Sequence, residues 1–128
     1  MKAKCLLDVE LRGVLKHIYT SRISGSLGRR VLDVVKSYDA ASASFEEAKA
    51  SLQKEFGVKG EDGQVSYKDG HVVLQEDKAD EFHKECNSLL DQDFAVKKLS
   101  IDDLEDIPSI SAREIQLLSE AGFIRALN

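Results

Sequence analysis

A long amphipathic helix is the strongest pattern along this chain. Hydrophobic side chains recur at spacings of four and three residues, at Leu27, Val31, Val34, Tyr38, Ala41, Phe45, Ala48 and Leu52. This spacing places the side chains along one seam of a helix. We predict a helix over 26–56, with Ser26 as its N-cap and Gly57 as its end. Such a long seam needs a partner to cover it.

A second, shorter helix is expected to supply that partner. Within residues 77–92, hydrophobic side chains repeat at spacings of three and four, at Ala79, Phe82, Cys86 and Leu89 or Leu90. Antiparallel packing of residues 26–56 against this segment would bury both stripes. Because the second helix is shorter, we expect the rest of the long seam to be covered by the N-terminal helix, the C-terminal segment or a second copy of the chain.

Between these helices, residues 65–74 predict a β-hairpin. Its Asp69-Gly70 pair favours the positive φ angles of a type I′ turn, which matches the twist of the two strands. A hairpin at the tip of two helices has little to pack against, and protruding loops are common recognition elements. The candidate recognition residues are Tyr67, Lys68, Asp69 and His71. The alternative is a hairpin without a binding role.

The chain ends carry weaker patterns. Alternating hydrophobic residues predict a strand at 2–7, which turns into a helix at about Asp8–Tyr19, and a loop follows it. A strand at 95–101 is expected to pair with residues 2–7, and the acidic segment 102–106 is expected to form a turn. Ser111 and Glu114 form a capping box that opens a last helix, and Gly122 ends it.

These patterns predict a mainly α fold with a small β component. It is a long antiparallel helical hairpin with a β-hairpin at its tip and a capped helix near the C-terminus. The 128 residues fit a single domain. Within it we expect an N-terminal strand, helix and loop over 1–25, the helical hairpin over 26–93, and a strand and helix over 94–128.

The composition of the chain indicates its cellular location. No hydrophobic run approaches the roughly 18 residues of a membrane-spanning helix, and the first residues do not have the pattern of a signal peptide. Two cysteines, Cys5 and Cys86, do not make a disulfide framework. We expect a cytoplasmic protein without a membrane partner.

Charge is distributed unevenly. The net charge is −5, but residues 1–38 carry eight Lys/Arg against three Asp/Glu, and residues 39–128 carry ten against twenty. Ordinary solvated helix faces explain this pattern, as does a basic end that meets an anionic partner or the acidic end of another copy. An acidic protein of pI about 5.2 is a poor nucleic-acid binder, so nucleic acid ranks below protein as a partner.

Catalytic and metal-binding patterns are weak. His83 and Cys86 lie three residues apart on one helix face, but zinc sites need about four ligands and no others show ligand spacing. Acidic residues 102–106 lack the alternating ligands of a calcium loop. Without a paired general acid and base, we predict a protein that is not an enzyme and has no cofactor, metal or catalytic residue.

One stretch has candidate binding chemistry. Exposed N–H groups and the helix dipole attract anions at a helix N-terminus, and arginine supplies bidentate donors. The candidate partner- or anion-binding residues at the start of the long helix are Arg22, Ser24, Ser26, Arg29 and Arg30. The alternative is a helix cap whose arginines only flank the core.

A family resemblance adds one expectation. The segment from Ser21 to Arg30, the Glu46-Glu47 pair, the Glu61-Asp62-Gly63 turn, the Phe82–Glu85 run and Leu89-Leu90 resemble small, functionally uncharacterised proteins of tailed phages over roughly residues 20–93. The resemblance implies a phage origin, and hence a role against a host enzyme or a host defence, in the host cytoplasm. It brings no assigned activity.

We therefore expect a non-enzymatic protein-binding module, with a phage-encoded inhibitor or modulator of a host nucleic-acid enzyme or defence factor as its specific form. One alternative is phosphate or nucleic-acid binding through the basic N-terminal third. Another is a structural assembly component, a homo-oligomer held together by its helical seam.

Overall fold

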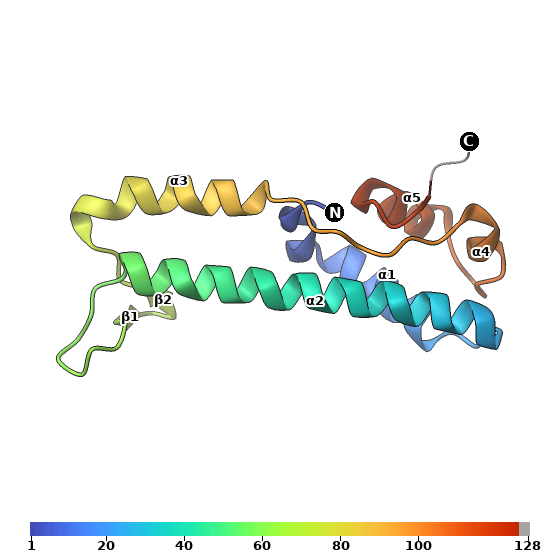
Figure 1. Ribbon diagram of the computed structural model, residues 1–128, viewed down its shortest axis with the longest axis horizontal. Coiled ribbons are helices and arrows are strands. Elements are labelled where there is room, and N and C mark those ends of the chain that lie inside the picture. The colour runs from blue at the N-terminus through green and yellow to red at the C-terminus, as the bar shows by residue number, and fades with distance from the viewer. Residues whose placement is uncertain (126–128) are drawn as a thin grey trace. The chain divides into compact units, whose positions relative to one another are not determined.

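The computed structural model describes residues 1–125, and most of its elements are helices (Figure 1). Five α-helices lie in this part of the chain: α1 (Val9–Thr20), α2 (Gly25–Phe56), α3 (Ala79–Leu90), α4 (Ile101–Glu105) and α5 (Ala112–Ala121). Two 3₁₀ helices and two short strands accompany them: Ala3–Leu7, Glu76–Lys78, β1 (Tyr67–Lys68) and β2 (His71–Val72). The fold is mainly helical with a small antiparallel sheet, as predicted.

The chain forms two compact units. The first unit contains Met1–Ser42 and the segment from Asp93 onward, and the second contains Ala43–Gln92. Helix α2 contributes its first half to one unit and its second half to the other.

The predicted seam of α2 is confirmed for most of its length. Six of its eight predicted side chains are buried, namely Leu27, Val31, Val34, Tyr38, Ala41 and Phe45, whereas Ala48 and Leu52 are half-buried. The predicted cap was wrong by two residues. The helix begins at Gly25, and the hydroxyl of Ser24 accepts a hydrogen bond from the Leu27 amide at 3.4 Å. Ser26 therefore lies in the first turn of α2. The earlier start places Leu27 inside the helix, where its side chain is buried.

The first unit packs α1 against α5 and α2. Asp8 caps α1 and accepts hydrogen bonds from the Glu10 and Leu11 amides at 2.9 and 3.3 Å. The capping box that opens α5 is confirmed, since Ser111 and Glu114 each bond the other's amide at 3.1 and 3.0 Å. The core between these helices includes the fully buried side chains Leu11, Ile18, Leu27, Val34, Leu99, Leu104, Leu118 and Phe123.

The predicted strands at the chain ends were wrong. Residues Ala3–Leu7 form a 3₁₀ helix, because the Cys5 and Asp8 amides bond to carbonyls three residues earlier in the chain. Just before 95–101, Lys2 forms an isolated antiparallel bridge to Asp93, and Met1 and Phe94 exchange hydrogen bonds at 3.0 and 2.8 Å. Within 95–101, Leu99 pairs in parallel with Ile124 instead. The expected acidic turn begins as the short helix α4, because Ser100 and Asp103 form a second capping box.

In the second unit, α3 runs antiparallel to the end of α2 (Figure 1). The rings of Phe56 and Phe82 meet edge to face, with 5.9 Å between their centroids. This confirms the predicted packing of the two helices. No residue of α3 is buried, however. The hydrophobic stripe of α3 is therefore only partly covered.

The predicted β-hairpin is also confirmed. Tyr67 pairs with Val72 and Lys68 with His71. Asp69 and Gly70 have φ angles of 53° and 79°, as a type I′ turn requires. The strands are shorter than predicted. At the base of the hairpin the Val73 amide donates to the Ser66 carbonyl, and Val58 bonds to both residues: its amide donates to the Val73 carbonyl, and its carbonyl accepts from the Ser66 amide.

Two glycines offer a matched test of packing. A Cβ at Gly57, where α2 ends, would lie 2.5 Å from the Gln53 carbonyl oxygen and 2.7 Å from Val65 Cγ1. We expect Gly57→Ala to destabilise the protein by about 2 kcal/mol, because the crowded backbone cannot move cheaply. A Cβ at Gly13, inside α1, meets nothing within 4 Å.

Gly13→Ala should therefore stabilise the protein by up to about 1 kcal/mol, since alanine is the better helix former. Urea denaturation of both variants measures the difference. Equal free energies of unfolding in the two variants would contradict the packing at Gly57.

Candidate functional site

The candidate anion-binding residues at the start of α2 differ in exposure and in partners. Ser24 is occupied as the helix cap. Ser26, Arg22 and Arg29 are exposed, and neither arginine forms an ion pair within residues 1–125. Of the three arginines, Arg30 has a carboxylate partner within the described residues. The segment thus supplies a cap, two free cations and one anchored arginine.

Arg30 is held by a carboxylate from the C-terminal part of the first unit. Its Nε and Nη2 donate to the same Oδ1 of Asp103, at 3.1 and 2.7 Å. Burial alone would raise the pKa of Asp103, but hydrogen bonds from Ser100 and Arg30 outweigh it and hold the pKa below its usual range. Arg30 therefore links α2 to the start of α4.

The candidate recognition hairpin is exposed. Tyr67, Lys68, Asp69 and His71 all face solvent, and the Tyr67 side chain is 62% exposed. None of the four has a side-chain hydrogen bond to another described residue, so the hairpin presents an aromatic ring and charged groups without a fixed arrangement. Its recognition role stays a prediction.

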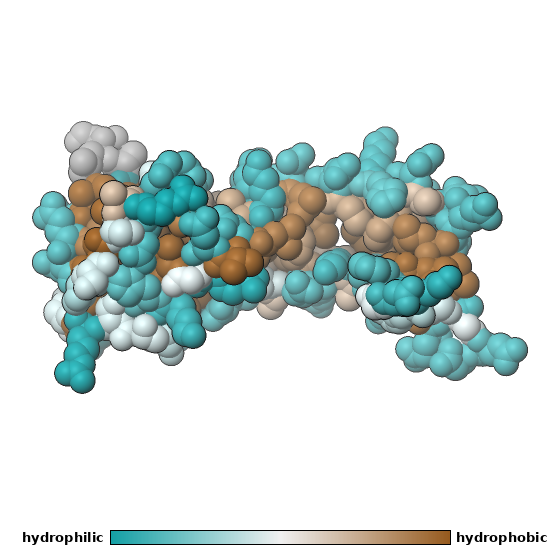
Figure 2. Space-filling model, turned by 180° about the vertical axis from the view of Figure 1, so that it is seen from behind, coloured by the Kyte–Doolittle hydropathy of each residue, from teal (hydrophilic) through white to brown (hydrophobic). Residues whose placement is uncertain are grey.

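A hydrophobic groove lies between the two helices of the second unit. Its cavity of about 470 Å³ is lined by Ala48 and Leu52 of α2, by Glu85, Ser88 and Leu89 of α3, and by Asp91 and Gln92. We call this surface the seam groove. In the space-filling view, hydrophobic surface is visible between hydrophilic side chains in this part of the chain (Figure 2). The seam predicted from the sequence is thus open where α2 meets α3.

The second unit is strongly acidic. Residues 43–92 contain six lysines, no arginine and twelve aspartates and glutamates, for a net charge of −6. Glu85 and Asp91 line the seam groove itself. The groove therefore combines a hydrophobic floor with an acidic rim.

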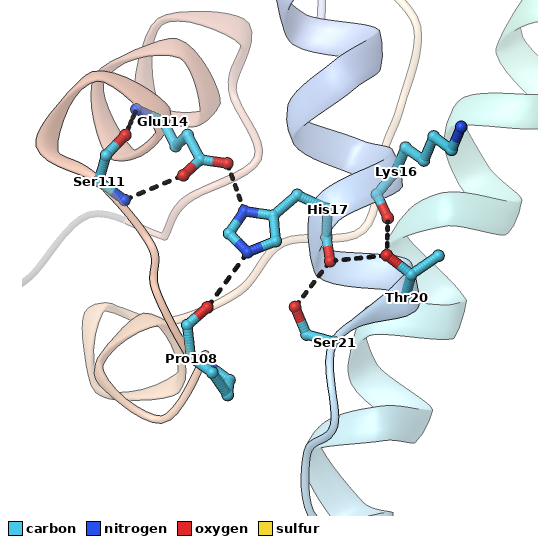
Figure 3. Close-up of polar contacts among 7 residues, drawn as sticks. All are labelled: Lys16, His17, Thr20, Ser21, Pro108, Ser111 and Glu114. Atoms are coloured by element: carbon cyan, nitrogen blue, oxygen red, sulfur yellow. Dashed lines mark hydrogen bonds and ion pairs between the residues drawn. The ribbon is translucent and has the colours of Figure 1, made fainter.

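A histidine links two segments of the first unit (Figure 3). In α1, Nδ1 of His17 contacts Oε2 of Glu114 and Nε2 lies 3.1 Å from the Pro108 carbonyl oxygen. The Glu114 carboxylate also accepts the Ser111 amide. The two ring nitrogens of His17 thus contact one side chain and one backbone carbonyl at the start of the segment that forms α5. His17 therefore fixes the start of α5 against α1.

Acid should loosen this contact. Burial raises the pKa of Glu114, but hydrogen bonds from His17 and Ser111 outweigh it, so the pKa lies below its usual range. A carboxyl with a lowered pKa contributes stability above its unfolded pKa of about 4.3 and loses it as pH falls through the folded value. We expect Glu114→Gln to have a flatter stability curve on the acid side of that pKa. Chemical denaturation across this range checks it, and an unchanged slope would contradict it.

The cysteines and acidic residues show no further site. Cys5 and Cys86 are free, and burial raises the pKa of the Cys86 thiol, although Lys49 lowers it in part. A raised pKa leaves less of the reactive thiolate at neutral pH. Across residues 1–125, no three His, Cys, Asp or Glu side chains gather as metal ligands. Within the same range, no helix is both long and hydrophobic enough to cross a membrane.

The chain was compared with protein-family models, curated proteins and solved structures, and none of them matches it. The resemblance to tailed-phage proteins therefore stays a prediction.

Proposed function

We propose that this protein is a non-enzymatic protein-binding module, and that the seam groove is its binding surface. The observation that carries the proposal is the incomplete cover of α3. None of its residues is buried, although its hydrophobic stripe faces α2. Hydrophobic side chains left half covered between two helices form a groove of the kind that binds the hydrophobic face of a third helix.

The negative charge of the second unit indicates the class of partner. The second unit carries −6, and two copies that met groove to groove would bring their acidic rims together. Like charges brought into contact oppose association, whereas opposite charges speed it and favour the right partner. The partner we propose is a helix with a hydrophobic stripe flanked by lysine and arginine. This argument disfavours the alternative of a homo-oligomeric assembly component.

The phage resemblance suggests a more specific form of the same function. A host nucleic-acid enzyme has basic surfaces, because it must neutralise phosphates. An acidic module that docks on such a surface would inhibit or modulate it. This form of the proposal rests on the resemblance, whereas the binding surface rests on the groove.

A designed peptide tests the binding surface. Isothermal titration calorimetry should detect binding of an amphipathic helical peptide with leucines along one face and lysines on either side. The same peptide with glutamates in place of lysines should bind at least tenfold more weakly. Leu52→Asp and Leu89→Asp should each abolish binding, because they place a charge on the hydrophobic floor.

Ala43→Asp is the matched control, since Ala43 lies exposed on the same half of α2, and it should bind as the wild type does. Equal binding of both peptides, or no binding of either, would overturn the proposal. Sedimentation analysis tests the alternative in which the groove binds a second copy of the chain. A dimer of the wild-type protein that Leu89→Asp converts to a monomer would assign the groove to a second copy instead.

A further inference from the structure

A second cavity, in the first unit, gathers cations from three parts of the chain. It measures about 420 Å³ and is lined by Arg30 and Asp33 of α2, by Val96, Lys97 and Lys98, and by Arg125. Four of the six lining residues are basic and one is acidic. In a protein with 23 acidic and 18 basic residues, this local excess of positive charge is unusual.

Backbone contacts hold the lining residues in place. The Lys97 amide donates to the hydroxyl of Ser37 on α2 at 3.0 Å. The next residue but one, Leu99, accepts the Arg125 amide at 2.8 Å, and the Leu99 amide donates to the Phe123 carbonyl at 2.7 Å. These bonds fix both segments beside α2. These backbone hydrogen bonds therefore bring Lys97, Lys98 and Arg125 close to Arg30.

The charges around the cavity are not balanced. Asp103, which does not line the cavity, neutralises part of the Arg30 charge, and Asp33 is the acidic residue of the lining. Lys97, Lys98 and Arg125 form no ion pair with any residue in the described range. Counting both carboxylates, four positive charges face two negative ones. A concave surface with an excess of one sign concentrates counter-ions of the other.

The types of donor group around the cavity indicate the class of anion. Arg30 uses Nε and Nη2 on Asp103, so its Nη1 group remains as a donor. Arg125 adds a second guanidinium, and the two lysines add ammonium groups. Guanidinium and ammonium groups together are the donors that bind phosphoryl oxygens. A cavity of this volume lies within the size range of small-molecule sites.

We propose that this cavity binds a small phosphate-bearing molecule. The site differs from the one expected at the start of α2, because Arg22, Ser24, Ser26 and Arg29 do not line it. The site shares no lining residue with the seam groove. Anion binding can therefore be tested independently of the proposed protein binding. A free small anion fits better than a nucleic acid, since the net charge of −5 repels a polyanion beyond the cavity.

Titration with pyrophosphate at low salt tests the proposal. Calorimetry of the full chain should show saturable binding that weakens as salt is added. Lys98→Gln combined with Arg125→Gln should weaken it by about tenfold for each cation removed. Both side chains are exposed and the backbone bonds at these positions remain, so the double variant should melt as the wild type does.

The control removes the same charge elsewhere. Lys4→Gln combined with Lys16→Gln changes two exposed cations that do not line the cavity, and it should bind pyrophosphate as the wild type does. An equal loss of affinity in the control would reduce the effect to general electrostatics and overturn the site. Absence of saturable binding at millimolar pyrophosphate would also overturn it. Tighter binding of a short single-stranded oligonucleotide than of pyrophosphate would overturn the assignment to a small molecule.

Discussion

Phe45→Asp should lower the free energy of unfolding by at least about 4 kcal/mol, because it removes a buried ring and puts a charge in its place. The Phe45 side chain is 5% exposed and lies on the seam of α2, where the second unit begins. Proteins of this size are stable by about 5–15 kcal/mol. We therefore expect a large loss of helicity and a broad, early thermal transition.

Circular dichroism during heating and urea titration measures this effect. Ala43→Asp and Ala50→Asp are matched controls on the same helix, because both alanines are exposed. Each should change stability by less than about 1 kcal/mol. If Phe45→Asp unfolds at the same temperature and urea concentration as its controls, the seam of α2 does not form a core.

Asp103→Ala has the second-largest expected effect. The Asp103 side chain is 10% exposed, accepts two bonds from Arg30 and caps α4 together with Ser100. Removing it leaves Arg30 without its partner and the Ser100 amide without its acceptor, although the Ser100 hydroxyl still caps the backbone amide of position 103. Breaking a buried pair costs about 3 kcal/mol or more. Because Arg30 is 44% exposed and water can solvate it, we expect the lower end of that range.

Two variants separate the contributions at this position. Asp102→Ala removes the exposed neighbouring carboxylate and should have a small effect. Asp103→Asn keeps an acceptor but loses the charge, so it should fall between the wild type and Asp103→Ala. The pKa of Asp103 is lowered, so its contribution is present above the unfolded pKa and is lost as pH falls through the folded one. If Asp103→Ala and Asp102→Ala unfold at the same urea concentration, the pair does not link α2 to α4.

The long helix, the second helix, the β-hairpin turn and the last capping box were predictable because each depends on neighbouring residues. A 3-4 spacing, an Asp-Gly pair and a Ser followed by Glu three residues later are local signals of structure. The strand prediction for 2–7 was wrong because alternating hydrophobic residues also fit a short 3₁₀ helix. Asp8 caps α1 directly after this segment. That cap and the local 3₁₀ bonds then determine the conformation.

The candidate sites were less predictable, because they depend on residues far apart in the sequence. The sequence indicates Arg30 as a candidate partner- or anion-binding residue but not its partner Asp103, which lies 73 residues away. The cavity that joins Arg30 to Lys97, Lys98 and Arg125 left only one local signal, the adjacent pair of lysines. His17 gave none, since its partners Pro108 and Glu114 are more than ninety residues away.

Amide hydrogen exchange of α3 tests the central claim most directly. Since α3 has no buried residue, its amides should exchange faster in the free protein than those of α1, which packs in the core of the first unit. On addition of the lysine-flanked peptide, protection should rise in α3 and in the second half of α2, and the first unit should not change. Protection confined to the first unit, or an α3 that is already fully protected in the free protein, would contradict the seam groove as the binding surface.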